Sequence, residues 1–217
     1  MNTKYLVVAT FATFATSALA APYNYAAWAS STSSSAVGTV GTDAVTFSGP
    51  LSGLLTNYAG GYYDDFPSDY ISSTVSNAPA TTDNFIQLVG GPGTGTYTLT
   101  LTTPVNNLVV SVLSLGGGSS AQFNFDKSFT ILSQGPDQWG GSNTSLTQSG
   151  DDLVGTEGSG SILFAGSTQT LTWTLPTAEN WYGFTVAAPA AVPEPSSIAI
   201  LGVGALGLLI RRKRTPR

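Results

Sequence analysis

The 217-residue sequence contains no cysteine, no histidine and no methionine after Met1. Without cysteine the protein cannot have a disulfide framework, a thiolate nucleophile or a thiolate zinc site, so its core alone must stabilise it. Without histidine it cannot have a Ser-His-Asp triad, an imidazole general base or a histidine metal site. The catalytic chemistry that remains is that of carboxylates, or of a serine paired with Lys127, and the alternative is no catalysis at all.

Basic residues are nearly absent from the long central part of the chain. Lys127 is the only basic residue among residues 5–210. All 12 acidic residues lie between Asp43 and Glu194. Residues 21–195 therefore carry one positive charge against 12 negative charges, a net charge of −11. This charge repels nucleic acid, so we expect no nucleic-acid partner, and it leaves the protein open to divalent cations.

The first residues have the pattern of a secretory signal peptide. Lys4 precedes an apolar stretch at residues 5–15, and Ala18 and Ala20 form an Ala-x-Ala pattern. This order is typical of a segment that signal peptidase removes. We expect residues 1–20 to be the signal peptide, with cleavage after Ala20, and the rest of the protein to be exported.

Three signals follow one another near the C-terminal end of the sequence. Pro193, Glu194 and Pro195 favour an extended, exposed peptide, because proline lacks an N–H and disfavours helical geometry in the residue before it. Residues 196–210 are uncharged and rich in Leu, Ile, Ala and Gly, which predicts a transmembrane helix. A basic cluster then stops translocation and faces the cytoplasm by the positive-inside rule. It comprises Arg211, Arg212, Lys213 and Arg214.

The apolar span is short for a permanent anchor. Its length at ~1.5 Å per residue reaches only ~22 Å, whereas the hydrocarbon core of a bilayer is ~30 Å thick. A span of this length suits a temporary hold on the membrane. The alternative interpretation is an ordinary single-pass anchor that follows a proline-rich stalk.

The order of tripeptide, apolar span and basic cluster resembles the PEP-CTERM sorting signal, which is found on exported proteins of exopolysaccharide-producing Gram-negative bacteria. The resemblance covers residues 192–214, with the sorting signal itself at residues 193–214. It implies that Pro193, Glu194 and Pro195 are the processing motif of an exosortase, a membrane-embedded cysteine transpeptidase-like enzyme. It further implies a precursor held in the inner membrane that, once processed, reaches the cell surface or the extracellular matrix.

The central part of the chain has the pattern of an all-β domain. Apolar residues alternate with Thr, Ser and Asn over short runs, which Gly, Pro or Asp interrupt at intervals of about 8–12 residues. We expect residues 21–187 to form an antiparallel β-sandwich of the jelly-roll or immunoglobulin-like type, and residues 188–192 to be a linker. The predicted strands are residues 42–48, 84–89, 96–103, 108–115, 121–125, 129–133, 146–149, 152–157, 160–165, 168–175 and 181–187.

A first group of aromatic and acidic residues lies at residues 58–70 and lacks a strand pattern, so we expect a long loop. Tyrosines beside carboxylates can stack on sugar rings and bind their hydroxyls, and clustered aspartates can bind calcium. The alternative is that the rings fill the edge of the core. The candidate carbohydrate-binding residues are Tyr62, Tyr63 and Asp65, and the candidate calcium ligands are Asp64, Asp65 and Asp69.

A second group contains Trp139 and Trp181, each with acidic residues nearby in the sequence. Indole rings offer a flat, amphipathic surface, so this pair is a candidate platform for a polysaccharide. The alternative is that both, like Trp173, belong to the core or close a loop.

Three functions remain open. The first, which we favour, is a noncatalytic surface or matrix protein that binds exopolysaccharide through exposed aromatic rings. The second is a glycoside-active enzyme in which Asp137 works with Glu157 or Glu179, the carboxylates being ~5–9.5 Å apart. The third is a purely structural coat or adhesive module. The favoured hypothesis has no catalytic residue and no cofactor other than the calcium considered above. Its partners are signal peptidase, an exosortase, exopolysaccharide and, before processing, the inner membrane.

Overall fold

The computed structural model describes residues 20–55, 63, 66–80, 85–117, 121–179 and 181–191. The predicted signal peptide, apart from Ala20, and the predicted sorting signal with its transmembrane helix lie outside these residues. Within the described ranges, no helix is both long enough and apolar enough to cross a membrane.

The described chain folds into strands and one short 3-10 turn. The strands are β1 (Tyr23–Ser31), β2 (Ser35–Val40), β3 (Asp43–Ser48), β4 (Gly53–Leu55), β5 (Phe85–Leu88), β6 (Thr96–Leu115), β7 (Ala121–Phe125), β8 (Thr130–Gly135), β9 (Leu146–Ser149), β10 (Asp152–Gly155), β11 (Gly158–Thr174) and β12 (Tyr182–Pro189). The 3-10 turn is η1 (Pro67–Tyr70).

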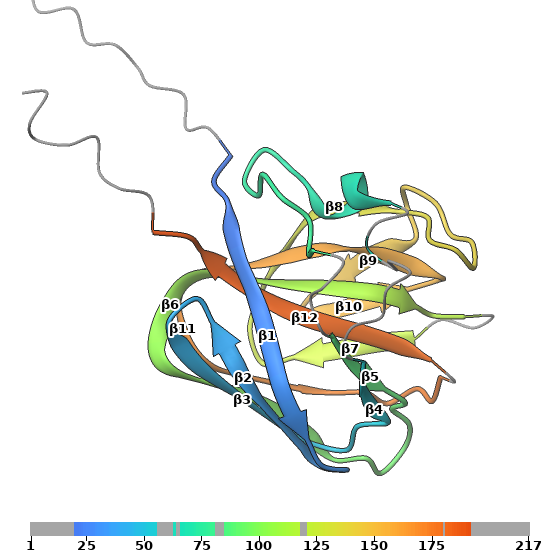
Figure 1. Ribbon diagram of the computed structural model, residues 1–217. Helices are drawn as coiled ribbons and strands as arrows, with labels where there is room; N and C mark the ends of the chain where they lie inside the picture. Colours follow the sequence, from blue (N-terminus) through green and yellow to red (C-terminus); the bar gives the residue numbers. More distant parts are fainter. Residues whose placement is uncertain are drawn as a thin grey trace, which may run out of the picture.

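The strands form one antiparallel sheet that closes on itself (Figure 1). Strand β12 pairs with β1 on one side and with β6 on the other. Between these two partners, β1, β2, β3 and β6 follow one another as neighbours. The all-β, antiparallel prediction is therefore confirmed. The sandwich type is not confirmed, because the hydrogen-bonded ladder continues around a barrel-like ring.

Two long strands make this closure possible. The first part of β6 pairs with β3 and the last part pairs with β12, while β11 follows β6 along both parts. The sequence predicts two separate strands in place of β6 and two separate strands in place of β11. In the structure the interruptions are irregularities of register in β11, between Phe164 and Ser167 and between Thr168 and Thr170. Because a bulge bends a strand and increases its twist, one long strand can serve both halves of the ring.

Strands β1, β2 and β4 are not predicted from the sequence. Strand β1 is rich in alanine and serine, so its intrinsic β-propensity gives little signal. Its Tyr23, Tyr25 and Trp28 are nevertheless buried, and β12 and β2 pair with its backbone on either side. Tertiary pairing, not local propensity, makes this segment a strand.

The sequence predicts a tight hairpin at Ser149, Gly150 and Asp151, between two predicted strands, and this hairpin is present. Ser149 of β9 pairs with Asp152 of β10, and Gly150 has a positive φ of 64° that suits a tight turn. The sequence also predicts that a turn at residues 157–160 continues this hairpin into a meander, and that prediction is wrong. Strand β10 pairs with β7 and β9, whereas β11 pairs with β6, β7 and β8, so the chain crosses to another part of the sheet after β10.

The end of β12 reaches into the segment predicted as a linker at residues 188–192. Ala188 pairs with Asn24, and Pro189 pairs with Tyr23. The ordered, paired part of the body thus continues almost to the start of the sorting signal.

Aromatic rings fill the centre of the core. Trp173 of β11 is 3% exposed and lies parallel to the ring of Tyr97, with centroids 5.9 Å apart and an interplanar angle of 10°. Its ring centroid is also 5.9 Å from that of Phe47 and 5.4 Å from that of Phe184. Trp173 therefore joins β3, β6, β11 and β12 across the closed sheet.

We expect Trp173→Ala to lower the free energy of unfolding by about 3–5 kcal/mol, because it removes a large buried ring and leaves a cavity. Denaturant unfolding measures this change. The matched control is Val37→Ala on β2, where the side chain is 44% exposed and the loss is expected to stay below about 0.5 kcal/mol. Equal losses for the two variants would contradict the central position of Trp173.

Candidate functional site

Four segments meet at the end of the sheet where β6 ends and β12 begins. Leu115 of β6 pairs with Gly158 of β11, and Gly135 of β8 pairs with Ser159 of β11. Strand β12 runs alongside the same part of β6, so Glu179 and Trp181 lie at this end too. We call this end the site pole and define it as residues 114–117, 135–141 and 155–159 together with Glu179 and Trp181.

Asp137 is buried in the turn that follows β8 and is 6% exposed. One carboxylate oxygen, Oδ1, accepts hydrogen bonds from the backbone N–H groups of Trp139 and Gly140 at 2.8 and 3.2 Å. The other oxygen, Oδ2, accepts a hydrogen bond from the Ser159 hydroxyl at 3.0 Å. The carboxylate thus holds both its own turn and the beginning of β11, and the turn presents Trp139.

Ser159 links this carboxylate to a second one. Its Oγ accepts a hydrogen bond from the backbone N–H of Ser114 at 3.0 Å, and the Ser114 hydroxyl donates to Oε1 of Glu157. Ser114 and Glu157 have positive φ angles of 54° and 58°, which are uncommon for residues other than glycine. Two strained residues are therefore held against each other by a side-chain hydrogen bond at the site pole.

Glu179 is the third acidic residue of the pole and is 9% exposed. Its Oε2 accepts a hydrogen bond from the N–H of Gly116 at 2.9 Å, and its Oε1 accepts one from the N–H of Gly117. Its own N–H donates to the carbonyl oxygen of Val89. The carboxylate therefore fastens the loop before β12 to the end of β6.

Glu157 and Glu179 flank Gly117. A Cβ placed on Gly117 would lie 3.1 Å from Oε2 of Glu157 and 3.2 Å from Oε1 of Glu179. The two carboxylate oxygens can be no farther apart than the sum of these distances, which is below the ~6.5–9.5 Å of inverting glycosidases but allows the ~5–5.5 Å of retaining ones. Only glycine leaves the gap between them open.

Burial shifts the pKa of two of these acids. It raises the pKa of Asp137, with the nearby charge of Glu157 adding to the effect and the donors from Trp139, Ser159 and Gly140 opposing it. Burial likewise raises the pKa of Glu179, against the lowering effect of its two backbone donors. Because Lys127 is the only basic residue among residues 5–210, the protein has almost no positive charge to offset the repulsion between the carboxylates of this pole.

The two tryptophans of the second predicted group come together at this pole. The ring centroids of Trp139 and Trp181 are 4.7 Å apart with an interplanar angle of 47°. Trp139 is 49% exposed, and Trp181 is half-buried with its ring edge-on to Phe85 at 5.8 Å. The pair forms a ledge whose inner ring is anchored in the core and whose outer ring faces solvent.

The first predicted group has a different environment. Tyr63 is 3% exposed, and its ring packs edge-on against Tyr70 at 4.9 Å and Phe85 at 5.9 Å. For Tyr63 the structure supports the alternative in which a ring fills the edge of the core, so it presents no face to a sugar. The other sugar-binding candidates of this group, Tyr62 and Asp65, lie outside the described residues.

The calcium hypothesis gains no support from Asp69. This side chain is 7% exposed, its carboxylate lies against Gly135, and burial raises its pKa. Asp64 and Asp65 lie outside the described residues, so their part of the hypothesis stays a prediction. Within the part of the chain that the structure describes, no group of three acidic residues is arranged to hold a metal ion.

The sequence singles out Asp137, Trp139, Glu157, Glu179 and Trp181, and the structure brings all five to one pole. The sequence alone does not reveal the residues that connect these five. Ser114, Ser159 and the backbone of Gly116 and Gly117 carry the hydrogen bonds between the acids. The glycine run after β6 is the one signal in the sequence, since it allows close backbone approach there.

Comparison with known families identifies the tail. Residues 191–214 match the family profile of the PEP-CTERM protein-sorting motif. The match confirms the motif expected from Pro193, Glu194 and Pro195 and is consistent with a substrate of an exosortase. No curated protein matches the chain.

The raised pKa values of Asp137 and Glu179 predict how stability depends on pH. The folded protein keeps these protons to higher pH than the unfolded chain, whose values are near 3.8 and 4.5. The contribution to stability is therefore full below these unfolded values and is lost as pH rises through the folded pKa values. We expect the free energy of unfolding to fall as pH rises above these unfolded values, measured by urea titration at a series of pH values.

Asp137→Asn and Glu179→Gln should each flatten this pH dependence, because the group that titrates is gone. The matched control is Asp151→Asn in the exposed turn between β9 and β10, which should keep the slope of the unmodified protein. An unchanged slope in both site variants would show that these two acids do not set the pH dependence.

Proposed function

We propose that this protein, which carries a PEP-CTERM sorting motif at residues 191–214, is a noncatalytic cell-surface or extracellular-matrix protein that binds a polysaccharide at its site pole. The motif supports export and processing by an exosortase. The binding part of the proposal rests on one observation, the exposed Trp139 ring packed at a tilt against the anchored ring of Trp181.

The Trp139 and Trp181 pair suits a sugar chain because its geometry exists before the ligand arrives. The buried carboxylate of Asp137 holds the backbone of Trp139, and Phe85 supports Trp181. A ring that is already positioned loses little conformational entropy on binding, and its apolar face can cover the C–H face of a sugar. Neighbouring polar groups can then bind hydroxyls.

The charges of the pole restrict the class of polysaccharide. Asp137, Glu157 and Glu179 lie together, and the net charge of residues 21–195 is −11, from one lysine and 12 acids. A polyuronate or sulfated chain would be repelled. We therefore propose a neutral chain or one with amino sugars, whose ammonium groups are attracted both to the carboxylates and to the indole faces.

The hydrogen bonds of the acids support a binding role over hydrolysis. Both oxygens of Glu179 accept backbone N–H groups, and both oxygens of Asp137 are also occupied as acceptors. A general acid must instead carry a proton and direct it to the glycosidic oxygen. These two carboxylates hold the loops of the pole, and Glu157 has no second acid with free oxygens beside it among the described residues.

Trp139→Ala should weaken binding of the matching oligosaccharide by roughly tenfold or more, because an aromatic anchor is lost. The exported protein would be titrated with neutral glucan, N-acetylglucosamine, glucosamine and polyuronate oligomers by calorimetry. Val37→Ala, which removes apolar surface from β2, is the control and should leave affinity unchanged. Equal affinity of the protein and Trp139→Ala for every oligomer would refute the platform, and release of reducing ends would refute the noncatalytic role.

The sorting motif is tested separately. Glu194→Ala should accumulate as a full-length precursor in the membrane fraction, because the residue between the two prolines is part of the processing motif. Pulse-chase labelling followed by gel electrophoresis measures the precursor and the shortened product. Lys213→Ala, which leaves three basic residues in the cluster, serves as the control and should mature normally. Normal maturation of Glu194→Ala would refute the assignment.

A further inference from the structure

Among the described residues, Ala190 is the one nearest the tail that bonds to the body, and it lies close in sequence to the processing motif. The N–H of Ala190 donates to the carbonyl oxygen of Pro22 at 2.9 Å. Three residue steps lead from Ala190 to Pro193, and an extended chain spans at most ~3.6 Å per residue, so Pro193 lies within roughly 11 Å of the body. An enzyme that binds residues 193–195 must therefore meet the surface of the body near Ala190.

This surface is at the opposite end of β12 from the site pole. We call it the tail pole and define it as Asn24 of β1, the β2–β3 turn at residues 40–43, residues 105–106 of β6, and residues 188–191. Strand β12 has eight residues, so it separates the two poles by roughly 25 Å (Figure 1). An enzyme at the tail pole would leave the Trp139 and Trp181 ledge accessible.

The tail pole is hollowed where the chain leaves the body. A groove of about 410 Å³ lies between the β2–β3 turn, Val105 and Asn106 of β6, and the end of β12. Ala188, Pro189 and Ala191 form one wall of it, so the last described residues before the processing motif run along the groove.

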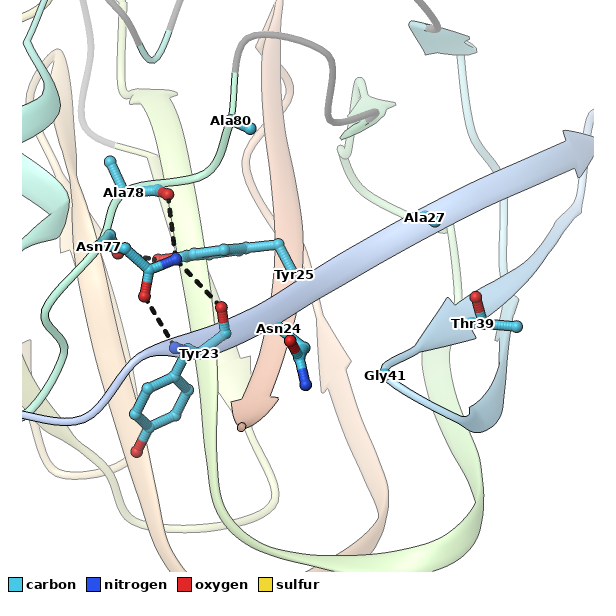
Figure 2. Close-up of a pocket in the computed structure, with 9 residues that line it drawn as sticks. All are labelled: Tyr23, Asn24, Tyr25, Ala27, Thr39, Gly41, Asn77, Ala78 and Ala80. Carbon is cyan, nitrogen blue, oxygen red and sulfur yellow. Dashed lines mark hydrogen bonds between the residues drawn. The ribbon is translucent and has the colours of Figure 1, made fainter. Parts of the chain in front are cut away.

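A second hollow of about 350 Å³ adjoins the first, and the two share Asn24 and Gly41 (Figure 2). Its far wall is braced by Asn77, whose Oδ1 accepts a hydrogen bond from the N–H of Tyr23 at 2.7 Å. The Asn77 amide nitrogen donates to the carbonyl oxygen of Tyr23 at 3.0 Å, so this side chain pairs with β1 as a neighbouring strand would (Figure 2). These two hydrogen bonds hold the segment around Asn77 against β1, and so keep this wall of the hollow in place.

The tail pole carries little of the charge of the body. Among the described residues that line the two hollows, the one carboxylate belongs to Asp43, and its Oδ1 accepts a hydrogen bond from the Thr103 hydroxyl at 2.8 Å. The buried acids of the site pole lie at the other end of β12. Anionic lipid headgroups therefore repel the tail pole less than the site pole, so the tail pole can approach the membrane more closely.

From this geometry we infer that the tail pole is a docking surface for the membrane-embedded processing enzyme, which grips the body in the two hollows while it acts on residues 193–195. This inference rests on the sorting part of the proposed function. The enzyme reads more than the tripeptide, because the tether from Ala190 is too short for the motif to be bound away from the body. Processing should then depend on the shape of the groove and on the length of the tether.

The test places a bulky ring in the groove of the full-length precursor. Asn106 is exposed and lines the groove, so Asn106→Trp should slow conversion of the precursor about fivefold or more in a pulse-chase experiment. Thr42→Trp, in the β2–β3 turn, should act in the same direction. A further change inserts six residues of alternating Gly and Ser after Ala191. If the body merely obstructs the enzyme, the insertion should restore the rate at which both variant precursors are converted. If the hollows contribute binding, the insertion should slow conversion of the otherwise unmodified precursor.

The matched control is Asn143→Trp, which makes the same change at an exposed loop between β8 and β9. It should be processed at the unmodified rate, and thermal melts of all precursors should coincide. The inference is overturned if Asn106→Trp and Thr42→Trp mature as fast as Asn143→Trp, or if the insertion leaves the rate of the unmodified protein unchanged. A different result would refute the sorting assignment and not the docking surface. That result is either no conversion of the unmodified precursor or normal conversion of the Glu194→Ala precursor.

Discussion

The pairing of β12 is the constraint on which the rest of the molecule depends. This strand bonds to β1 and β5 as well as β6, and its pairing with β1 and β6 closes the ring of β1, β2, β3, β6 and β12. Its first residue follows Trp181 directly, and its last residues lead to the sorting motif. One strand therefore closes the fold, positions the aromatic ledge and determines where the tail leaves the body.

The shortage of positive charge has equally wide consequences. Three acids gather at the site pole, where no lysine or arginine from the body other than Lys127 could neutralise them. The protein instead satisfies them with serine hydroxyls and backbone N–H groups, at the cost of burial that raises the pKa of Asp137 and Glu179. The resulting negative field selects against anionic ligands at one pole and leaves the other pole able to approach a membrane.

Much of this arrangement could be predicted from the sequence. The alternation of residues 96–103 and 121–125 and the turn at Gly150 are local features, so the corresponding strands and hairpin were recognisable. Strand β1 was not, because its alanines and serines form a strand only through pairing with β2 and β12. Closure of the sheet depends on bulges in β11, which composition does not distinguish from the end of a strand.

In the candidate site, too, some features could be predicted from the sequence and others depend on the folded structure. The residue types and their acidic surroundings were enough to select Trp139, Trp181 and the three carboxylates. Exposure could not be predicted, since nothing in the sequence distinguishes the buried Tyr63 from the exposed Trp139. The connecting role of Ser114 and Ser159 depends on register between strands that are far apart in the chain, and register is a property of the folded sheet.

The most direct test of this account is hydrogen–deuterium exchange on the full-length precursor with and without a saturating glucosamine oligomer. The account predicts slower exchange at residues 137–140 and 179–181, at the beginning of β12, and no change at residues 188–190, at its end. Slower exchange at the tail end, or no change at either end with any neutral or amino-sugar oligomer that binds, would contradict it.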